Sequence, residues 1–367
     1  MKRIVFLMTS CKKRGPVQQT LNIIKNLDRT QFDPYLVTLY EEDKKTSQLD
    51  KFTPYVKHIF VPTSKINLVL GKDTELRRTL ENINPNVVHS LGVFPDFAVC
   101  RMKRFKQIIT LRNYVYEDYV AKFGKIKGLL LAKMHLYAMK RTSKTVACSE
   151  SLSIIYKEKL NLRYDFVRNG VDIEQYSKPS ETEKFVIREK MKLPLDTFIY
   201  VYTGQLIKRK NLDFLLKTFT QTYKDRSVYL LVLGGGSEYQ QLYEKYGSFE
   251  NVDFRGNVLN VNEYLKACDA YISASKSEGL PNGVLEAMAT GLPVILSDIP
   301  QHKEIYEVDK TIGYIFENNN EKDLAFKMTQ LVNSDFKSKG MASCQLVYNF
   351  FSARIMSLKY QELYKSL

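Results

Sequence analysis

Two glutamates, Glu278 and Glu286, are the residues whose type and spacing most clearly predict chemistry. They lie in the segment 274–294, which follows an apolar run, passes through a loop of glycine, proline and asparagine, and enters a short helical pattern. In a sheet with helices on both faces, ligands bind at the carboxyl end of a strand, where a helix begins. Backbone N–H groups around 281–284 and the helix dipole suit a pyrophosphate, and the two carboxylates accept hydrogen bonds from hydroxyls such as those of sugars and riboses.

A second segment, 201–216, holds three consecutive cations, Lys208, Arg209 and Lys210, shortly after another apolar run. Preorganised positive groups stabilise the charge that develops on a leaving diphosphate. Taken alone, each segment also has an ordinary structural interpretation, because glutamates are common in solvated loops and near helix starts, and basic turns are common on surfaces. The complete arrangement, with both segments placed after strands, favours a ligand site.

Both segments need a parallel sheet to position them, and the sequence alternates short β-rich runs with longer helical patterns. That alternation is typical of doubly wound α/β domains. The first half predicts strands at 3–8, 35–39, 58–61, 86–90, 107–111 and 145–149. The second half predicts strands at 198–203, 229–234, 252–254, 270–275 and 293–297, several of them apolar enough to be buried on both faces.

The length of 367 residues exceeds one ordinary hydrophobic core and fits two domains. A polar stretch with a proline at 177–184 is the expected linker. We therefore expect an N-terminal Rossmann-like domain over 1–177, a C-terminal Rossmann-like domain over 178–347, and an amphipathic helix over 348–367 that packs back at the domain junction.

The segment that begins at Glu278 resembles glycosyltransferase family 4, whose shared mark is the frame E-G-x-P-x-x-x-x-E-A-x-A-x-G-x-P-V. Glu278 and Glu286 fall in that frame without a gap, together with its glycines, proline and alanines. Around Lys210 the sequence is similar to the family's G-R-L-x-x-x-K-N segment. Weaker matches lie in the family's order at 146–149, 167–172, 232–237 and 254–258.

The resemblance implies a GT-B architecture, in which two Rossmann-like domains face a cleft, and a retaining transfer of a sugar from a nucleoside diphosphate donor. It gives Glu278 the donor sugar's hydroxyls and Glu286 the ribose, and it makes Glu278, Lys210 and Arg209 the expected catalytic residues. The family's usual arginine is Gln205 here, so Arg209 or Lys208 is expected to supply that charge. The implied donor-binding residues are Gly15, Gly204, Gln205, Lys210, Gly256, Asn257, Val258, Glu278, Gly279, Leu280, Pro281, Asn282, Gly283 and Glu286.

In the first half the resemblance points to acceptor contacts. Gly15 stands where the family has a Gly-Gly loop, although Pro16 replaces the second glycine and offers no N–H. The expected acceptor-binding residues are His89, at the end of a strand, and Arg112 with Asn113, where many members carry an active-site histidine. A structural role is the alternative for His89.

No Asp-x-Asp pattern occurs in the sequence, so the carboxylate pair that holds a divalent ion in the other large glycosyltransferase fold is absent. The resemblance therefore implies no metal and no cofactor, with cations and a helix N-terminus binding the diphosphate instead. By the same analogy the departing phosphate activates the acceptor hydroxyl, and the two glutamates bind the donor rather than act as a hydrolase pair.

Basic residues are concentrated in the first half: 1–172 holds 31 Lys and Arg against 16 Asp and Glu, and 173–367 holds 24 of each. Helical spacing in the basic stretch 122–141 brings Leu129, Leu130, Met134 and Tyr137 together beside lysines. Such helices lie on anionic membranes, and an ordinary core helix with a solvated lysine face explains the pattern equally well. The charge asymmetry favours a lipid-linked acceptor at an anionic membrane surface, and no nucleic-acid motif supports a nucleic-acid partner.

Five scattered cysteines without a C-x-x-C pair, and an N-terminus with too short an apolar run for a signal peptide, predict a cytoplasmic protein that at most lies at the inner face of the plasma membrane. We expect a glycosyltransferase that uses a nucleotide sugar, UDP-linked by default, and builds capsule, cell-wall or other surface glycan on a lipid-linked or polysaccharide acceptor. Two alternatives stay open: a sugar-nucleotide epimerase of the same fold, and a non-catalytic scaffold in a membrane complex, which the departures at Gln205, Pro16 and Arg112 favour.

Overall fold

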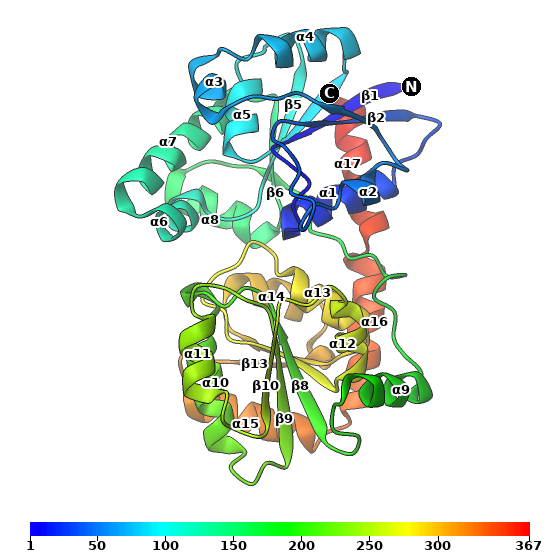
Figure 1. The fold of residues 1–367 in the computed structure, drawn as a ribbon, viewed down its shortest axis with the longest axis vertical. Coiled ribbons are helices and arrows are strands. Elements are labelled where there is room, and N and C mark those ends of the chain that lie inside the picture. Colours follow the sequence, from blue (N-terminus) through cyan, green and yellow to red (C-terminus); the bar gives the residue numbers. More distant parts are fainter. The chain divides into compact units, whose positions relative to one another are not determined.

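The computed structural model describes residues 1–367 and divides the chain into two compact units (Figure 1). The first unit comprises Met1–Gly170 and Ala353–Leu367, and the second comprises Val171–Ser352. The chain thus passes from one unit to the other twice. At these two passages the Val171 N–H donates to the Phe351 carbonyl at 2.8 Å. The boundaries expected from the sequence, after residues 177 and 347, fall seven residues after the first passage and five residues before the second.

The first unit is built on a seven-stranded parallel sheet in the order β3-β2-β1-β4-β5-β6-β7. Its strands are β1 (Lys2–Met8), β2 (Phe32–Thr38), β3 (Lys57–Phe60), β4 (Val87–Leu91), β5 (Lys106–Leu111), β6 (Lys144–Ala147) and β7 (Asp165–Phe166). All six strands predicted for the first half are present. The edge strand β7 has no predicted counterpart, because two residues are too few to show a periodic pattern.

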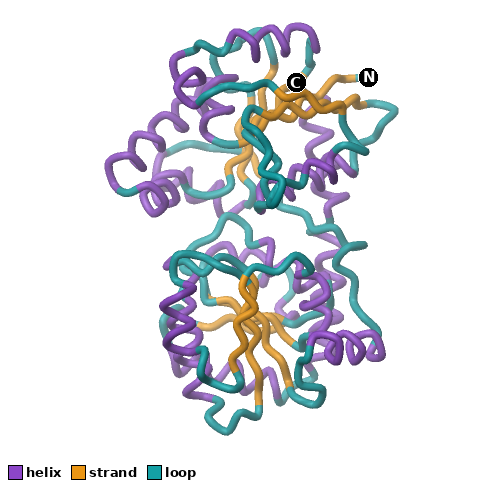
Figure 2. Tube along the Cα trace, in the orientation of Figure 1, coloured by secondary structure: helices purple, strands orange, loops and turns teal.

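Helices cover both faces of this sheet (Figure 2). They are α1 (Gly15–Lys25), α2 (Leu49–Phe52), α3 (Lys65–Leu70), α4 (Thr74–Ile83), α5 (Val93–Val99), α6 (Val115–Phe123), α7 (Lys125–Arg141), α8 (Glu150–Leu160) and α17 (Ala353–Ser366). One apolar core joins the sheet to α1 and α17, and another joins it to α3, α4 and α5. Alternate residues of β1 divide between the two: Ile4 and Phe6 enter the first core, and Val5 and Leu7 enter the second.

The C-terminal helix α17 packs against α1 within the first unit (Figure 1). Tyr360 and Tyr364 are fully buried in the core that contains α1. The Ser357 side chain of α17 donates through Oγ to the Ile23 carbonyl of α1 at 2.8 Å, which ties the two helices together. The predicted helix over 348–367 is therefore two pieces in the structure, because residues 348–350 end α16 (Phe336–Phe350) of the second unit and α17 starts at Ala353.

The second unit contains a six-stranded parallel sheet in the order β10-β9-β8-β11-β12-β13. Its strands are β8 (Phe198–Thr203), β9 (Val228–Leu233), β10 (Val252–Gly256), β11 (Ala270–Ser273), β12 (Val294–Ser297) and β13 (Gly313–Phe316). The five predicted strands are present, and β13 is additional. The strand order reverses between β8 and β11, and such a reversal leaves a ligand-binding crevice at the carboxyl ends of the strands.

Helices flank the second sheet as well, and buried side chains from 212–219, 242–246 and 324–331 join a core cluster with its strands. They are α9 (Glu181–Met191), η1 (Lys208–Lys210), α10 (Leu212–Thr222), α11 (Tyr239–Tyr246), α12 (Val261–Ala267), α13 (Asn282–Ala289), α14 (Pro300–Tyr306), η2 (Lys310–Ile312), α15 (Glu321–Val332) and α16 (Phe336–Phe350). None of the helices in either unit combines enough length with an apolar sequence to traverse a bilayer.

A buried carboxylate fastens α9 to the amino ends of β8 and β11. Asp269 accepts a hydrogen bond from Arg188 Nη2 at 2.6 Å and another from Lys184 Nζ at 2.5 Å. It also accepts from the Ile199 N–H at 2.7 Å. Because these contacts lie at the opposite end of the strands from the switch-point loops, Asp269 stabilises the fold rather than the candidate site.

Candidate functional site

Most of the residues predicted to bind a donor lie at the carboxyl ends of β8 and β11. The chain turns through η1 after β8, and it forms the loop 274–281 before α13 after β11. The two loops are bonded to each other, because the Lys276 N–H donates to the Arg209 carbonyl at 2.8 Å and Arg209 Nη1 donates to the Ser277 carbonyl at 2.6 Å. The reversal of strand order therefore brings segments far apart in the sequence into one site.

Glu278 is the centre of an ion-paired cluster in this site. Its Oε2 accepts a hydrogen bond from Arg209 Nη1 at 2.8 Å, and its Oε1 accepts from Lys210 Nζ and from Ser275 Oγ. Glu278 is 8% exposed. Burial alone would raise the pKa of Glu278, but the charges of Lys210 and Arg209 outweigh burial and lower it to about 2. The carboxylate is therefore ionised near neutral pH and holds both cations.

Only two of the three cations in η1 face Glu278. Arg209 and Lys210 are half-buried and paired with it, whereas Lys208 is exposed and takes part in no ion pair of the structure. The side chain of Gln205 is also exposed, and only its backbone carbonyl is engaged. The geometry thus favours Arg209 over Lys208 as the substitute for the arginine that Gln205 replaces.

Glycines lie at the carboxyl ends of β8, β9 and β10: Gly204 and Gly234 directly follow β8 and β9, and Gly256 is the last residue of β10. The Gly234 N–H donates to the Gly256 carbonyl at 2.7 Å. A Cβ at Gly234 would lie 1.8 Å from the Gly204 carbonyl oxygen, so no other residue fits there. Gly256 itself has a φ of 63°, and Asn257 and Val258 follow it directly. These close approaches bring the predicted residues Gly204 and Gly256 to the same edge of the sheet as η1.

Helix α13 begins in direct contact with β8 and β11. A Cβ at Gly283 would lie 2.6 Å from Thr203 Oγ1 and 2.8 Å from the Tyr271 hydroxyl, so glycine is required for this approach. The first turn closes with the Leu285 N–H donating to the Pro281 carbonyl. The positive end of the α13 dipole therefore lies at the switch point. Of the predicted residues here, Gly279, Leu280 and Pro281 are buried, and Asn282 and Gly283 are half-buried.

Glu286 lies one turn further along α13 and is half-buried. Its charge acts on two tyrosines, Tyr176 and Tyr271. Burial is the main cause that raises the pKa of Tyr176, and the charge of Glu286 comes second. Burial also raises the pKa of Tyr271, and the charges of Glu278 and Glu286 raise it further. The two glutamates of the frame therefore differ in surroundings. Glu278 is paired with two cations, whereas Glu286 lies among tyrosines.

His302, at the start of α14, is a buried polar residue of this region that the sequence analysis missed. It is fully buried, and its Nδ1 lies 3.0 Å from the Ser297 carbonyl and 3.1 Å from Ser297 Oγ. Burial is the main cause that lowers the pKa of His302, to about 4, so the ring is neutral near pH 7. A single histidine after an apolar run carries no distinctive sequence signal.

The remaining residue that the sequence predicts to bind the donor, Gly15, lies in the first unit. It is the first residue of α1, at the carboxyl end of β1, and Pro16 follows within the first turn. A proline is tolerated there because the first-turn N–H groups have no intrahelical partner. The replacement of the second loop glycine by Pro16 is thus compatible with a regular helix start.

The structure gives His89 structural contacts. Its Nδ1 is 2.8 Å from the Tyr364 hydroxyl and its Nε2 is 2.8 Å from Thr110 Oγ1. Burial, together with the nearby charge of Arg112, lowers the pKa of His89 to about 3. Both ring nitrogens are engaged inside the core of the first unit, so none is left for an acceptor. These contacts favour the structural role that the sequence left as the alternative for His89.

Arg112 keeps its place as a candidate acceptor contact. Its Nη1 donates to Asn169 Oδ1 at 2.6 Å, while Nε and Nη2 have no hydrogen-bond partner. No carboxylate forms an ion pair with this guanidinium, which lies just after β5 at the carboxyl edge of the first sheet. The neighbouring Asn113 is half-buried and donates to Asp118 Oδ1 at 3.3 Å.

Helix α7 of the basic stretch has two different faces. Its buried face includes His135, whose Nε2 is 2.9 Å from the buried Asp96 carboxylate. Its exposed face presents Ile126, Leu130 and Tyr137, with 88%, 67% and 44% of each residue accessible. The same stretch of the chain holds six exposed basic residues: Lys122, Lys125, Lys127, Lys133, Lys140 and Arg141. Leu129 and Met134, expected on the same face, are half-buried instead.

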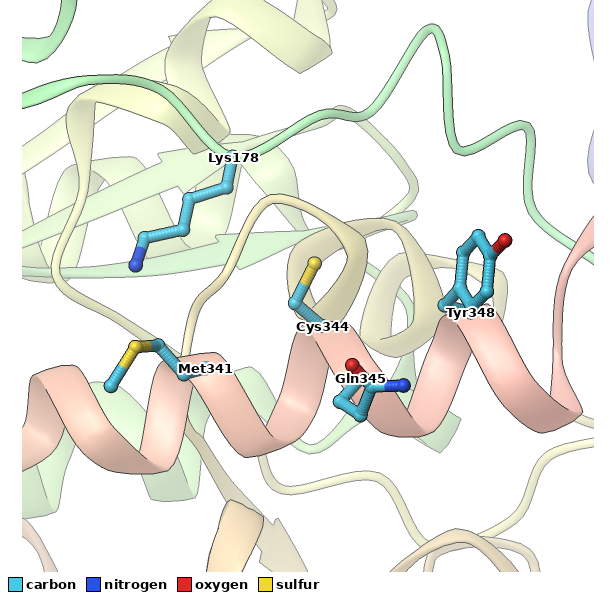
Figure 3. A pocket seen from close by; sticks show the side chains of 5 residues that line it. All are labelled: Lys178, Met341, Cys344, Gln345 and Tyr348. Carbon is cyan, nitrogen blue, oxygen red and sulfur yellow. The ribbon is translucent and has the colours of Figure 1, made fainter.

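A separate cavity of about 360 Å³ lies in the second unit beside α16, lined by Lys178, Met341, Cys344, Gln345 and Tyr348 (Figure 3). The side chain of Lys178 extends over the α16 side chains in this view. Cys344 Sγ donates to the Ala289 carbonyl at 3.6 Å, and burial raises the pKa of the thiol. None of the predicted site residues lines this cavity. Nor do any three His, Cys, Asp or Glu side chains of the structure lie where they could hold a metal ion.

Two doubly wound parallel units, the second with a cationic cluster and a helix N-terminus at its switch point, define the GT-B class of glycosyltransferases. Comparison with protein families agrees, because residues 14–175 match the family described as Glycosyltransferase Family 4 and residues 183–343 match Glycosyl transferases group 1. Together the two matches span most of both units. The chain belongs to these glycosyltransferases.

Similar proteins and structures carry related names. The chain is 24% identical over 314 residues to the O-antigen biosynthesis glycosyltransferase WclY of Escherichia coli, covering 83% of this chain and 82% of that protein. It is 26% identical over 306 residues to the UDP-Gal:alpha-D-GlcNAc-diphosphoundecaprenol alpha-1,3-galactosyltransferase of Escherichia coli, covering 78% and 76%. The structure of Anabaena Alr3699/HepE in complex with UDP and glucose has a TM-score of 0.83, with 16% identity and full coverage of both chains.

Proposed function

We propose that this chain is a retaining, metal-independent glycosyltransferase that moves a sugar from a nucleoside diphosphate, UDP by default, to a lipid-linked or polysaccharide acceptor. The observation that carries the proposal is the cluster of Glu278, Arg209 and Lys210 at the switch point of the second sheet. A carboxylate that accepts hydrogen bonds from hydroxyls, next to two cations that bind phosphate, matches the two ends of a nucleotide sugar.

Each residue of the site has a proposed role toward the donor. The diphosphate binds Lys210 and Arg209 and faces the N-terminus of α13 at Gly283, where the helix dipole adds to their charge. Glu278 accepts hydrogen bonds from the sugar hydroxyls, and Glu286 accepts them from the ribose. The diphosphate competes with Glu278 for the two cations, so donor binding frees the carboxylate for the sugar.

The reaction needs only groups that the donor and this site supply. The bond between the anomeric carbon and the phosphate oxygen breaks, and the charge that develops on the diphosphate is stabilised by Lys210 and Arg209. The acceptor oxygen forms the new bond to the same carbon on the face that the leaving group occupied, and its proton passes to a phosphate oxygen. No metal ion and no cofactor enters this scheme.

The names of similar proteins support the donor, the acceptor and the biological role. The galactosyltransferase from Escherichia coli is named for a UDP-sugar donor and for an acceptor linked to diphosphoundecaprenol, and WclY is named for O-antigen biosynthesis. The Anabaena structure is described as a complex with UDP and glucose. We accordingly propose a role in the synthesis of a bacterial surface glycan such as capsule, cell wall or O-antigen.

We further propose that the exposed face of α7 binds an anionic membrane surface, at the inner face of the plasma membrane, where a lipid-linked acceptor is found. Ile126 and Leu130 lie one helical turn apart and project into solvent, and lysines such as Lys127 and Lys133 flank them. Apolar side chains with flanking cations fit the boundary between headgroups and acyl chains, and each well-placed cation contributes about 1 kcal/mol.

A panel of nucleoside diphosphates and nucleotide sugars, read by thermal shift, tests donor binding, because a ligand that binds only the native state raises its melting temperature. We expect UDP and at least one UDP-sugar to raise it. Transfer is then tested by the release of nucleoside diphosphate with and without a lipid-linked acceptor preparation. Release that requires the acceptor supports transfer, whereas sugar interconversion without an acceptor contradicts it and favours an epimerase.

Flotation with vesicles of phosphatidylcholine alone, or with added phosphatidylglycerol, tests the membrane surface. We expect binding only to the anionic vesicles, weakened at high salt. Replacing both Lys127 and Lys133 by Glu should lower the binding constant by roughly 30-fold or more, given about 1 kcal/mol for each cation. Replacing both Lys224 and Lys322, exposed lysines of the second unit, by Glu is the matched control. Equal binding of wild type and the charge-reversed variant would contradict a role for α7.

A further inference from the structure

His302 has one ring nitrogen that the structure satisfies and one that it does not. The Ser297 carbonyl can only accept a hydrogen bond, so the nearby Nδ1 carries the proton and Nε2 is left as an acceptor. Nε2 is shielded from solvent and has no hydrogen-bond partner. A buried polar atom without a partner destabilises a fold, so His302 is costly where it stands.

A chain of hydrogen bonds leads from His302 to Glu278. Ser297 Oγ, 3.1 Å from His302 Nδ1, donates to the Ser275 carbonyl at 2.6 Å. Ser275 Oγ in turn donates to Glu278 Oε1 at 2.7 Å. The chain joins the start of α14, the end of β12 and the loop after β11, and every residue in it is buried.

His302 is also electrostatically close to the cluster. The charge of Glu278 acts on His302 in the direction that raises its pKa, and the charge of Lys210 acts in the opposite direction, both after the larger effect of burial. A neutral ring at this place supports the loop of Glu278 without adding a third cation that would compete with Arg209 and Lys210 for the carboxylate. A protonated lysine or arginine at 302 would not have this property.

We propose that His302 is a positioning residue for Glu278: through Ser297 and Ser275 it sets the direction in which the carboxylate points and so contributes to recognition of the donor sugar. This inference rests on the proposed function, in which Glu278 binds sugar hydroxyls. It predicts that changes at His302 weaken binding of the sugar part of the donor and leave binding of the nucleoside diphosphate unchanged.

Three variants separate the role of the hydrogen bond from that of the ring. His302→Leu puts an apolar side chain of similar size in its place and removes the hydrogen bond to Ser297. His302→Asn retains a donor near the position of Nδ1, and Ser297→Ala breaks the chain at its next link. Ser343→Ala is the matched control, because Ser343 is a buried hydroxyl of the same unit that donates to the Ile312 carbonyl and has no bond to the chain.

The measured quantity is the ratio of dissociation constants for UDP and for the UDP-sugar that raises the melting temperature most, obtained by calorimetry. We expect His302→Leu and Ser297→Ala to lower this ratio about 5- to 10-fold, the size of one hydrogen bond. UDP affinity should change by less than about twofold, and His302→Asn should recover most of the ratio. Ser343→Ala should leave the ratio unchanged even where it lowers the melting temperature.

A double-mutant cycle between His302→Leu and Glu278→Gln is read both in that ratio and in urea unfolding of the ligand-free protein. Non-additivity of about fivefold in the unfolding constant is expected if His302 positions Glu278. Additive effects in both readouts would overturn the inference. A different outcome is that the two substitutions are coupled in unfolding but the wild-type protein binds no nucleotide. That outcome would overturn the proposed function and would still support the positioning of Glu278 by His302.

Discussion

Arg209 and Glu278 form an ion pair with 2.8 Å between Nη1 and Oε2, which joins the loops that follow β8 and β11. Lys210 binds the other oxygen of the same carboxylate, so without a ligand one carboxylate neutralises two cations. A diphosphate carries more negative charge and forms stronger hydrogen bonds with both cations. In the proposed reaction, therefore, the phosphate end of the donor releases Glu278 for the sugar end.

Glu278→Gln tests this exchange, because it keeps the size of the side chain and removes its charge. We expect the affinity for a UDP-sugar relative to UDP to fall about 10- to 100-fold, since hydrogen bonds to a charged group contribute about 1.5–3 kcal/mol. Affinity for UDP itself should hold or rise, because Arg209 and Lys210 lose their competing partner. Calorimetry with both ligands measures the two effects. Unchanged affinity for both would remove Glu278 from the site.

Arg209→Ala should lower turnover by about 100-fold or more, the usual effect of removing one group that stabilises developing charge. Lys208→Ala is the internal control, because Lys208 lies in the same turn but is exposed and unpaired. It should stay within about twofold of wild type. Turnover is measured as acceptor-dependent release of nucleoside diphosphate at saturating donor. If Lys208→Ala lowers turnover more than Arg209→Ala does, then Lys208 rather than Arg209 supplies the charge that Gln205 lacks.

Much of the fold could be predicted because its signals are local. Eleven strands were readable as short apolar runs between helical patterns, and the structure contains all eleven. The edge strand β7 escaped because its two residues give too little periodicity, and the edge strand β13 was not predicted either. The end of α16 and the start of α17 merged into one predicted helix because both are amphipathic, and only tertiary packing divides them at Phe351 and Ser352.

The candidate site could be predicted only where a motif carried it. Glu278, Glu286 and Lys210 belong to spaced patterns, and the sheet topology brings their loops together. His302 and Ser297 belong to no pattern, and their relation to Glu278 depends on how neighbouring strands end. The contacts of His89 could not be predicted for a similar reason, because its partner Tyr364 lies 275 residues away in the sequence.

Asp269→Asn should destabilise the second unit by about 3–5 kcal/mol, because it removes the negative charge that holds the buried Arg188 and the nearby Lys184. Urea unfolding of the full chain measures the change as an earlier transition. Asp225→Asn is the control, since Asp225 is exposed and bonds only to Ser227 of its own turn. A shift equally small for both variants would show that the α9 attachment contributes little.

Acid should destabilise the protein in two stages. His302 and His89 have folded-state pKa values of about 4 and about 3, below the value near 6.5 for an unfolded chain, so the unfolded state binds more protons between these limits. Stability should fall as the pH drops below 6.5, by roughly 1.4 kcal/mol per pH unit for each histidine. Glu278, with its pKa lowered to about 2, adds a further loss below about pH 4.5.

Melting temperatures between pH 7.5 and pH 4 measure the first stage. His302→Leu should flatten the slope, because it removes one of the two buried histidines that must take up a proton. A slope in His302→Leu identical to that of wild type would mean that the ring is already protonated in the folded protein, contrary to its assigned tautomer.

Tyr364→Phe distinguishes a structural from a functional His89. The substitution removes only the hydroxyl that lies 2.8 Å from His89 Nδ1, and it leaves that nitrogen buried without a partner. The expected cost is about 1–3 kcal/mol in the stability of the first unit, with turnover within about twofold of wild type. Urea unfolding and acceptor-dependent turnover are measured on the same preparation. If turnover fell while stability held, the bond between α17 and His89 would serve the acceptor, and His89 would return to the proposed site. Lower stability with unchanged turnover would support a structural role for His89. Thr110 Oγ1 contacts the other ring nitrogen of His89, Nε2, and so holds the ring inside the core.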